Sequence, residues 1–302
     1  MVLDKWVQPI SDELPHISVV QGENEGKTPF AHALLIDDLL IDTGVGGRRM
    51  RKVSKKLDID RVFLSHWHED HVSGNSYIKD TPFFSHSLDK APIENVELFY
   101  KLYAVDDKDL LPQFRMYIDS LQVENTPIAG IFEDNDIFQT SHHTIQVVHT
   151  PGHTQGHCCF FEPEAKVLFL GDIDLSSFGP WYGTLDASLV DFESSIDKLI
   201  NLRAEYAISS HKGLSIGSKH IKKKLEAYKR TLTERDVRIQ AAIPKNGATL
   251  PDLEGQRLIY PKYTSFRPYF ILAESIMIKQ HLERLVQKNC LKKSATGVFR
   301  KI

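Results

Sequence analysis

The chain has 302 residues, of which 41% are hydrophobic and 25% charged, a composition typical of globular proteins and unlike disordered or fibrous ones. Residues 1–20 lack the basic start and apolar run of a secretory signal, and no stretch of about 18 apolar residues occurs, so we expect neither export nor a membrane span. Three cysteines, with Cys158 and Cys159 adjacent, indicate reduced thiols in a cytoplasmic protein.

The net charge of −3 hides two parts of opposite sign. Residues 1–211 hold 17 Lys and Arg against 33 Asp and Glu, whereas residues 212–302 hold 20 against 7. We therefore predict a catalytic domain at residues 1–217 and a basic C-terminal domain at residues 218–302. A basic domain can bind a polyanion such as nucleic acid, although Lys and Arg also solvate the outer faces of ordinary helices.

Taken in chain order, the predicted elements begin with strands. Apolar runs predict strands at residues 16–20, 30–36 and 39–41, followed by a basic helix at about 48–57 and a strand at 61–65. A second group of strands is expected at residues 145–149, 157–162 and 166–170, then a helix at 187–202 and a strand at 205–209. Residues 87–130, between the two groups, predict a helical insertion. Strands alternating with helices indicate an α/β fold.

The C-terminal domain is predicted to be helical. Ile221, Leu225, Tyr228 and Leu232 recur with helical spacing, so one face of this helix is apolar and the remainder is basic. Six Lys and Arg within residues 219–230 cannot be buried without partners, so we expect this helix to be partly exposed to solvent. A helix at about 270–288 and a hairpin at 290–302 follow. A helix with a terminal hairpin is the outline of a winged helix.

The sequence SHWHEDH at residues 65–71 directly follows a predicted strand. Three imidazoles and two carboxylates within six positions are too polar for a core, and they suit borderline divalent metals such as zinc. His66 and His68 project to one side of the strand end, whereas Asp70 and His71 can face a second point. That geometry predicts two ions rather than one. Glu69 points away from its neighbours, so we expect it to be solvated.

Three further candidate ligands stand beside glycines after later predicted strands, namely His153, Asp172 and His211. Side chains in such places lie on loops at the carboxyl edge of a sheet, so we expect them near the first four. We interpret the remaining histidines that stand alone as surface or hydrogen-bonded residues. These are His16, His32, His86, His142, His143, His149, His220 and His281.

This order of motifs resembles the metallo-β-lactamase superfamily, whose signature is His-x-His-x-Asp-His, followed by a glycine-flanked histidine, Gly-Asp and a late histidine. The resemblance covers about residues 14–215 and implies an αββα sandwich with two metals at one edge. The implied ligands are His66, His68 and His153 for the first metal, Asp70, His71 and His211 for the second, and Asp172 bridging both. Asp42 of Asp-Thr-Gly matches the aspartate that orients a ligand histidine, the alternative being an Asx turn.

Within the superfamily the chain is similar in part to the glyoxalase II-like branch and to β-lactamase-like endoribonucleases with a helical C-terminus. It lacks the cysteine- and arginine-containing stretch that follows the bridging aspartate of glyoxalase II. Phe178, Trp181 and Tyr182 stand there instead, and with Trp67 they are candidates to bind substrate. Loop packing over the site is the alternative role for the residues after Asp172.

Two divalent ions, Zn²⁺ with Fe or Mn as alternatives, would lower the pKa of a bridging water towards about 7, and Asp70 would steer the resulting hydroxide. We therefore expect a hydrolase of a small thioester, lactone or related ester. A phosphodiesterase or endoribonuclease on single-stranded nucleic acid is the alternative that the basic domain favours. A mononuclear iron persulfide dioxygenase is disfavoured because an enzyme with one metal would not need His211, a ligand of the second metal. We expect no membrane partner, and a homodimer stays an open alternative.

Overall fold

Two β-sheets form the centre of the computed structural model, which describes residues 5–263 and 266–302. The first sheet has the order β1 (Val7–Pro9), β2 (Ile17–Val20), β3 (Ala33–Ile36), β4 (Leu39–Ile41), β5 (Arg61–Phe63), β6 (Phe83–His86) and β7 (Ile128–Phe132). The second has the order β13 (Gly213–Ile216), β12 (Tyr206–Ser209), β11 (Val167–Phe169), β10 (Cys158–Glu162), β9 (Thr144–His149) and β8 (Ile137–Gln139). Strands β4 to β7 run parallel, as do β11 and β12.

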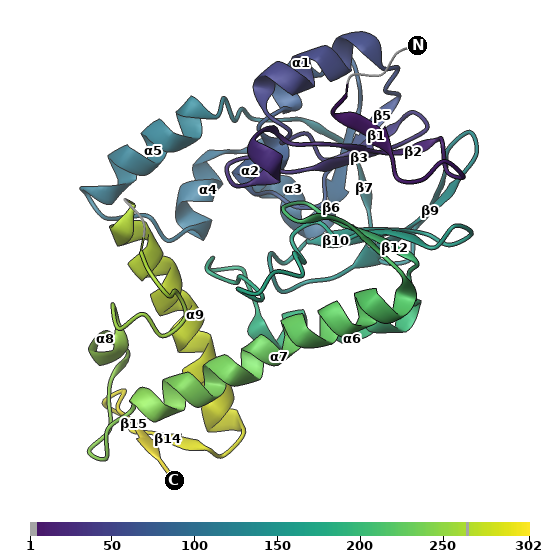
Figure 1. Ribbon diagram of the computed structural model, residues 1–302. Helices are drawn as coiled ribbons and strands as arrows, with labels where there is room; N and C mark the ends of the chain where they lie inside the picture. The colour runs from purple at the N-terminus through teal and green to yellow at the C-terminus, as the bar shows by residue number, and fades with distance from the viewer. Residues whose placement is uncertain (1–4, 264–265) are drawn as a thin grey trace.

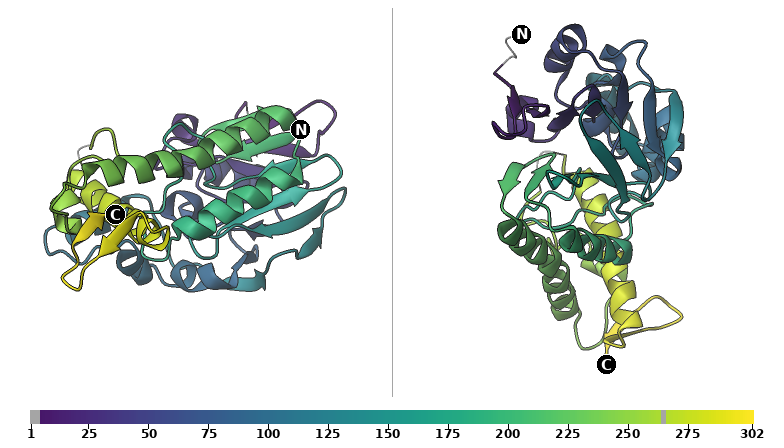
Figure 2. Two further views of the ribbon diagram at one scale, coloured as in Figure 1. Left: turned by 90° about the horizontal axis from the view of Figure 1, so that it is seen from below. Right: turned by 90° about the vertical axis from the view of Figure 1, so that its right-hand side faces the viewer.

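Helices cover the outer face of each sheet, as Figure 1 shows. On the first sheet lie α1 (Gly47–Lys56), α2 (Glu69–Val72), α3 (Ser87–Glu94), α4 (Glu97–Leu102) and α5 (Leu110–Ser120). On the second sheet lies α6 (Leu189–Leu202), with α7 (Ser218–Ala242) running beside it (Figure 2). Two single-turn 3₁₀ helices, η1 (Glu23–Gly26) and η2 (Asn75–Tyr77), lie in loops. The layers form the αββα sandwich that we predicted.

The space between the two sheets is filled by buried side chains from alternate positions of both sheets. The rings of Phe63 and Phe132 from the first sheet and Phe160 from the second lie within 5.3 to 5.7 Å of one another. Strand β10 supplies Cys158 to this interior core and Cys159 to the opposite face, because successive strand residues point to opposite sides. All three cysteines are free, as their spacing predicted.

The C-terminal segment adds α8 (Leu250–Leu253), α9 (Arg267–Gln287) and a hairpin of β14 (Leu291–Lys293) and β15 (Phe299–Lys301). On α7, the four residues predicted to form the apolar face are all buried, whereas Lys219, Lys222, Lys223 and Arg230 are exposed, which confirms the partial exposure of this helix. Helix α9 runs from beside α4 and α5 to the terminal hairpin (Figure 1). The winged-helix assignment of this segment stays a prediction.

The strands that the sequence did not predict are β1, β6, β7, β8 and β13. Four of them, β1, β7, β8 and β13, are edge strands, where one side of the strand meets solvent and the apolar pattern weakens, and β6 lies next to the edge strand β7. The predicted insertion at residues 87–130 contains α3, α4 and α5, and β7 begins within its last residues. Within residues 5–263 and 266–302, no helix combines the length and apolar character needed to cross a membrane.

Candidate metal centre

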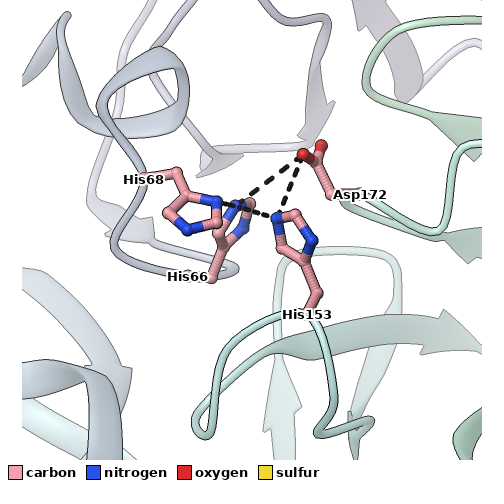
Figure 3. Close-up of side chains that lie close together, drawn as sticks. All are labelled: His66, His68, His153 and Asp172. Atoms are coloured by element: carbon pink, nitrogen blue, oxygen red, sulfur yellow. Dashed lines mark hydrogen bonds and ion pairs between the residues drawn. The ribbon is translucent and has the colours of Figure 1, made fainter. Parts of the chain in front are cut away.

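The seven predicted ligand residues meet at one edge of the sandwich, where the carboxyl ends of strands from both sheets lie together. His66 and His68 follow β5, His153 lies in the β9–β10 loop, and Asp172 and His211 follow the parallel pair β11 and β12. This edge is where loops from parallel strands gather functional side chains. Figure 3 shows three of these histidines and Asp172 converging from different loops.

The first group of ligands consists of His66, His68, His153 and Asp172, all buried or nearly so. His66 Nε2 lies 3.1 Å from His68 Nδ1 and 3.2 Å from His153 Nε2, and Asp172 Oδ2 lies 3.2 Å from His153 Nε2. Tetrahedral ligands at zinc-like bond lengths are about 3.3 Å apart. The group therefore has the size of a four-coordinate site.

The second group consists of Asp70, His71 and His211. His211 Nε2 lies 3.4 Å from Asp70 Oδ2, and Asp70 Oδ1 lies 3.8 Å from His71 Nε2. The other carboxylate oxygen of Asp172, Oδ1, lies 2.9 Å from His71 Nε2 and 3.1 Å from His211 Nε2. Asp172 thus presents one oxygen to each group, which is the geometry of a bridging ligand.

Hydrogen bonds on the far side of three histidines set which ring nitrogen faces the centre. His71 Nδ1 lies 2.7 Å from Asp42 Oδ2. His153 Nδ1 lies 2.9 Å from the carbonyl oxygen of Trp181, and His211 Nδ1 lies 2.6 Å from the carbonyl oxygen of Gly26. An acceptor at Nδ1 holds the proton there and leaves a lone pair on Nε2. Each Nε2 is therefore prepared to bind a cation.

Asp42 holds the ligand segment by hydrogen bonds to residues far along the chain. Its carboxylate accepts hydrogen bonds from the Ser65 backbone N–H, at 2.8 Å, from Ser65 Oγ, at 2.7 Å, and from His71. The Asx-turn alternative does not describe this side chain. Gly44 completes the local motif, because a Cβ there would lie 1.5 Å from the Asp70 carbonyl oxygen. The Asp-Thr-Gly turn therefore needs glycine to approach the ligand segment.

Burial and charge act on the imidazoles of the centre in opposite directions. Burial and the charges of neighbouring histidines lower the pKa values of His66 and His68, so these rings are neutral and can act as ligands. Burial also acts to lower the pKa values of His71 and His211, but the charge of Asp172, together with that of Asp42 for His71 and of Asp174 for His211 and with hydrogen bonds to carboxylates, outweighs it and raises both. An environment that favours a proton on Nε2 also favours a metal cation that replaces it.

The residues present fit a pair of divalent ions. Among the described residues, His71 Nε2 and Asp172 Oδ1 are buried and make no hydrogen bond of acceptable geometry, even to each other at 2.9 Å, although such atoms are normally satisfied. Imidazole and carboxylate are the donors that zinc, iron and manganese accept. Two ions would satisfy these atoms and offset the carboxylate charges.

Glu69 corrects one expectation, because it is buried rather than solvated. Its carboxylate accepts hydrogen bonds from Tyr103 Oη, at 2.5 Å, and from Tyr117 Oη, at 3.2 Å. Burial and the charge of Asp70 raise the pKa of Glu69 to about 7. The insertion that supplies both tyrosines turns Glu69 away from the metal ligands and buries it, an outcome of long-range packing that the local pattern does not contain.

Two of the predicted substrate-binding residues lie behind the site. Tyr182 is fully buried, with Oη 2.6 Å from His281 Nε2, and Trp67 is fully buried with Nε1 donating to Asp186 Oδ2 at 3.0 Å. Neither side chain is exposed, so neither can contact a substrate, which corrects the expectation that both bind substrate. Trp181 is partly exposed, and its ring lies 5.5 Å from that of His68 and 5.6 Å from that of His153.

Phe178, the remaining candidate, packs on residues of the C-terminal segment. Its ring lies 5.2 Å from that of Tyr260 and 4.7 Å from the Arg235 guanidinium. Tyr260 Oη in turn accepts a hydrogen bond of 2.6 Å from Trp181 Nε1. The aromatic residues after Asp172 therefore connect the metal centre to the C-terminal helices.

Two residues of the site were not predicted. His157 is fully buried, its ring lies 5.2 Å from that of His66, and its Nε2 accepts a hydrogen bond of 3.2 Å from the Asp172 backbone N–H. Asp174 lies within ligand distance of Asp172 and His211, and burial raises its pKa to about 6. The signal for Asp174 was its place two residues after the predicted ligand Asp172 in the sequence Gly-Asp-Ile-Asp.

The family model of the metallo-beta-lactamase superfamily matches residues 31–211, which hold all seven candidate ligands. The chain belongs to this superfamily. Its members typically bind divalent metals, which agrees with the His and Asp clusters described above. The match covers the sandwich and ends at His211, before α7 begins.

Two relatives and one solved structure show how far the likeness extends. An uncharacterized protein of Aquifex aeolicus is 25% identical over 198 residues, which cover 64% of this chain and 82% of that one. The atrochrysone carboxyl ACP thioesterase of Emericella nidulans is 27% identical over 166 residues, which cover 52% of this chain and 44% of the thioesterase. The chain thus spans less than half of that relative's length.

The solved structure of a beta-lactamase domain protein from Burkholderia ambifaria is similar over 100% of this chain and 96% of that one, with a TM-score of 0.73 and 15% identity. This likeness concerns the fold, and it includes α7, α8, α9 and the terminal hairpin.

Proposed function

We propose that this superfamily member is a hydrolase of a thioester, lactone or related ester that works with two divalent ions. The observation that carries the proposal is Asp172, whose two carboxylate oxygens face two separate groups of ligands. When bound, two such ions would polarise the substrate carbonyl and supply a nucleophilic hydroxide at neutral pH. The placement of the chain in the glyoxalase II-like branch stays a prediction.

Asp70 is the residue of this centre that we propose to be catalytic. Its oxygens lie 3.4 Å from His211 Nε2 and 3.8 Å from His71 Nε2, at the rim of the second group. From there one oxygen can bind a cation while the other accepts a hydrogen bond from the attacking group. This orientation fixes the direction of attack, and misalignment of a nucleophile by about 1 Å can cost about 100-fold in rate.

Aromatic rings beside His68 favour a substrate with an apolar acyl or ring portion. Trp181, which is partly exposed, lies 5.5 Å from the ring of His68, and Tyr103, which is buried, packs at the same distance behind that ring. Tyr269 of α9 lies 5.9 Å from Tyr103, so the C-terminal segment also approaches this region. Apolar surface next to a reacting carbonyl binds the non-reacting part of a substrate and orients it. The thioesterase among the relatives supports the thioester alternative.

The proposal is tested by replacing Asp70 with Ala and assaying a thioester, a lactone and a phosphodiester side by side. We expect hydrolysis of the preferred substrate to fall by about 1,000-fold or more, because metal geometry and nucleophile alignment fail together. Asp106→Ala, at an exposed position away from the centre, is the matched control and should keep full activity. Activity in Asp70→Ala within about tenfold of the parent would contradict the role of Asp70.

A phosphodiesterase or endoribonuclease is the second candidate, which the exposed cations of α7 favour. Several of these cations are already paired, as in Lys222 with Glu226, at 3.8 Å, and Arg230 with Glu234, at 3.7 Å. Pairing within the helix reduces the charge available to phosphates, so the ester hydrolase is the better-supported function. Cleavage of single-stranded RNA at low salt that falls when Lys219, Lys222 and Lys223 are replaced would favour the nuclease instead.

A mononuclear iron dioxygenase fits the centre less well. His71 and His211 are both held by acceptors at Nδ1 and both face Asp172 Oδ1. A protein that used one metal would have no use for this second, prepared group. We propose Zn²⁺ as the metal of the first group, where three imidazoles gather.

A further inference from the structure

A third carboxylate, that of Asp174, lies beside the second group of ligands, and neither the metal centre nor the proposed reaction described above uses it. An oxygen of Asp174 lies within 4.8 Å of both a ring nitrogen of His211 and a carboxylate oxygen of Asp172. The chain turns directly after β11, where the Ile173 N–H donates a hydrogen bond of 3.1 Å to the Leu170 carbonyl oxygen, and Ile173 is fully buried. The carboxylates of Asp172 and Asp174 leave this turn side by side, next to His211.

The carboxylate of Asp174 is not satisfied by the protein around it. Its Oδ1 atom is buried and has no hydrogen-bond partner among the described residues. The Ser209 hydroxyl donates to the backbone carbonyl of Asp174, not to its side chain. A buried carboxylate oxygen without a partner is unfavourable unless a cation compensates its charge. The basic groups near this side chain include His211, His153 and Lys212, of which the two histidines belong to the metal centre.

The two metal positions then differ in the chemistry of their donors. The first is rich in nitrogen, with His66, His68 and His153 beside one oxygen of Asp172. The second would be rich in oxygen if Asp174 joined Asp70 and Asp172. Imidazole suits zinc, whereas a larger share of carboxylate oxygen suits a harder ion such as Mn²⁺.

We propose that Asp174 is an additional carboxylate ligand of the second metal position and makes that position selective for a hard, six-coordinate divalent ion such as Mn²⁺. Together with Asp70, His71, Asp172 and His211 it supplies five protein donors, which leaves one position of an octahedron for water or substrate. The inference rests on the proposed two-metal centre.

The test compares the parent with Asp174→Asn, which keeps the shape of the side chain and removes its charge. Each metal-free chain is titrated with Mn²⁺ and, separately, with Zn²⁺, against a competing chelator, and the ions bound per chain are counted by elemental analysis. We expect two Mn²⁺ in the parent and a 10- to 100-fold weaker second Mn²⁺ in Asp174→Asn. The second Zn²⁺ should weaken less than fivefold, because zinc needs fewer ligands.

Asp174→Glu and Asp119→Asn serve as the second variant and the matched control. Asp174→Glu keeps the carboxylate, so the paramagnetic resonance spectrum of a coupled Mn²⁺ pair should persist with altered line positions. Asp119 is exposed on α5 and lies outside both groups of ligands, so Asp119→Asn should leave Mn²⁺ binding unchanged. Circular dichroism establishes that each variant is folded.

The outcomes separate this inference from the proposed function. A parent that binds two Mn²⁺, together with an Asp174→Asn variant whose second Mn²⁺ binds within threefold of the parent, overturns the role of Asp174 alone. If the parent binds only one ion of either metal, and His211→Ala binds that ion as tightly as the parent does, the two-metal centre is overturned and this inference with it.

Discussion

At the scale of single residues, the properties of the centre depend on atoms that would not touch a metal. His71 keeps its orientation through the 2.7 Å hydrogen bond to Asp42, and His153 through the carbonyl oxygen of Trp181. A histidine without such a partner can rotate or change tautomer, which weakens it as a ligand. The carboxylate of Asp42 therefore contributes to metal affinity from outside the ligand set.

Replacing Asp42 with Asn should weaken the second metal more than the first. The amide accepts fewer hydrogen bonds than the carboxylate, so it cannot hold both Ser65 and His71. We expect a 10- to 100-fold loss of affinity for the second ion, measured by chelator competition. Equal affinity for both ions in Asp42→Asn and the parent would show that Asp42 does not orient His71.

His32 should make the protein less stable in mild acid. Burial, with the charges of His211 and Arg49, lowers the pKa of His32 to about 4 from an ordinary value of 6.5. The folded chain therefore binds fewer protons than the unfolded chain between these values, so the free energy of unfolding falls as the pH drops from 6.5 to 4. Protonation of His32 at Nδ1 would break the 2.9 Å hydrogen bond that this atom accepts from the Gly22 N–H.

His32→Asn keeps a hydrogen-bond acceptor and removes the titration. Between pH 7.5 and 5 we expect this variant to lose about 2 kcal/mol less unfolding free energy than the parent, as measured by urea denaturation at the two pH values. Identical losses in the two proteins would mean that His32 is not a source of the acid sensitivity.

At the scale of elements, the ligand loops are held in place by the insertion on the first sheet. Asp89 of α3 accepts hydrogen bonds from the Trp67 N–H, at 3.2 Å, from Thr154 Oγ1, at 2.7 Å, and from the Gly156 N–H, at 2.7 Å. One buried carboxylate thus joins the loop that carries His66 and His68 to the loop that carries His153. The insertion positions the metal centre although it supplies none of the seven candidate ligands.

Asp89→Asn should destabilise the protein and loosen the first metal position. An amide oxygen can accept some of the three hydrogen bonds, but its nitrogen cannot, so at least one buried donor loses its partner. We expect a loss of about 1–3 kcal/mol in urea denaturation, together with weaker binding of the first ion. A variant as stable as the parent would show that the two loops hold their positions without Asp89.

At the scale of the whole molecule, the C-terminal helices share a core with the sandwich. One apolar cluster includes Leu168 of β11, Ile196 of α6, Leu232 of α7, Met277 of α9 and Phe299 of β15. A buried chain of hydrogen bonds also runs from Tyr182 through His281 of α9 to Asp236 of α7. We infer that the sandwich and the helices from α7 onwards unfold together.

Leu232→Ala tests this shared core, since Leu232 is fully buried on α7. We expect a loss of about 2–5 kcal/mol in a single transition that has the same midpoint by circular dichroism and by tryptophan fluorescence. Val237→Ala, at a 63% exposed position on the same helix, should change stability by less than about 0.5 kcal/mol. Two separate transitions would show that the C-terminal segment unfolds independently of the sandwich.

The sequence by itself determined the strands that precede the site and the set of candidate ligands. This was possible because the signals are local: a ligand must be His or Asp, and it must follow an apolar strand closely enough to lie at the sheet edge. The run of residues 65–71 satisfies both conditions within seven positions. The periodicity of α7 was equally local, so its buried and exposed faces could be predicted residue by residue.

Only the tertiary structure decided what surrounds those ligands. The acceptor for His211 is the carbonyl oxygen of Gly26, 185 residues away, and the partners of Glu69 come from the insertion. Tyr182 follows a metal ligand in sequence yet packs beneath α9, and Asp174 escaped notice although it points into the centre. These outcomes depend on which distant segments pack together. That choice is made by burial of apolar surface over the whole chain, which no local pattern of residues encodes.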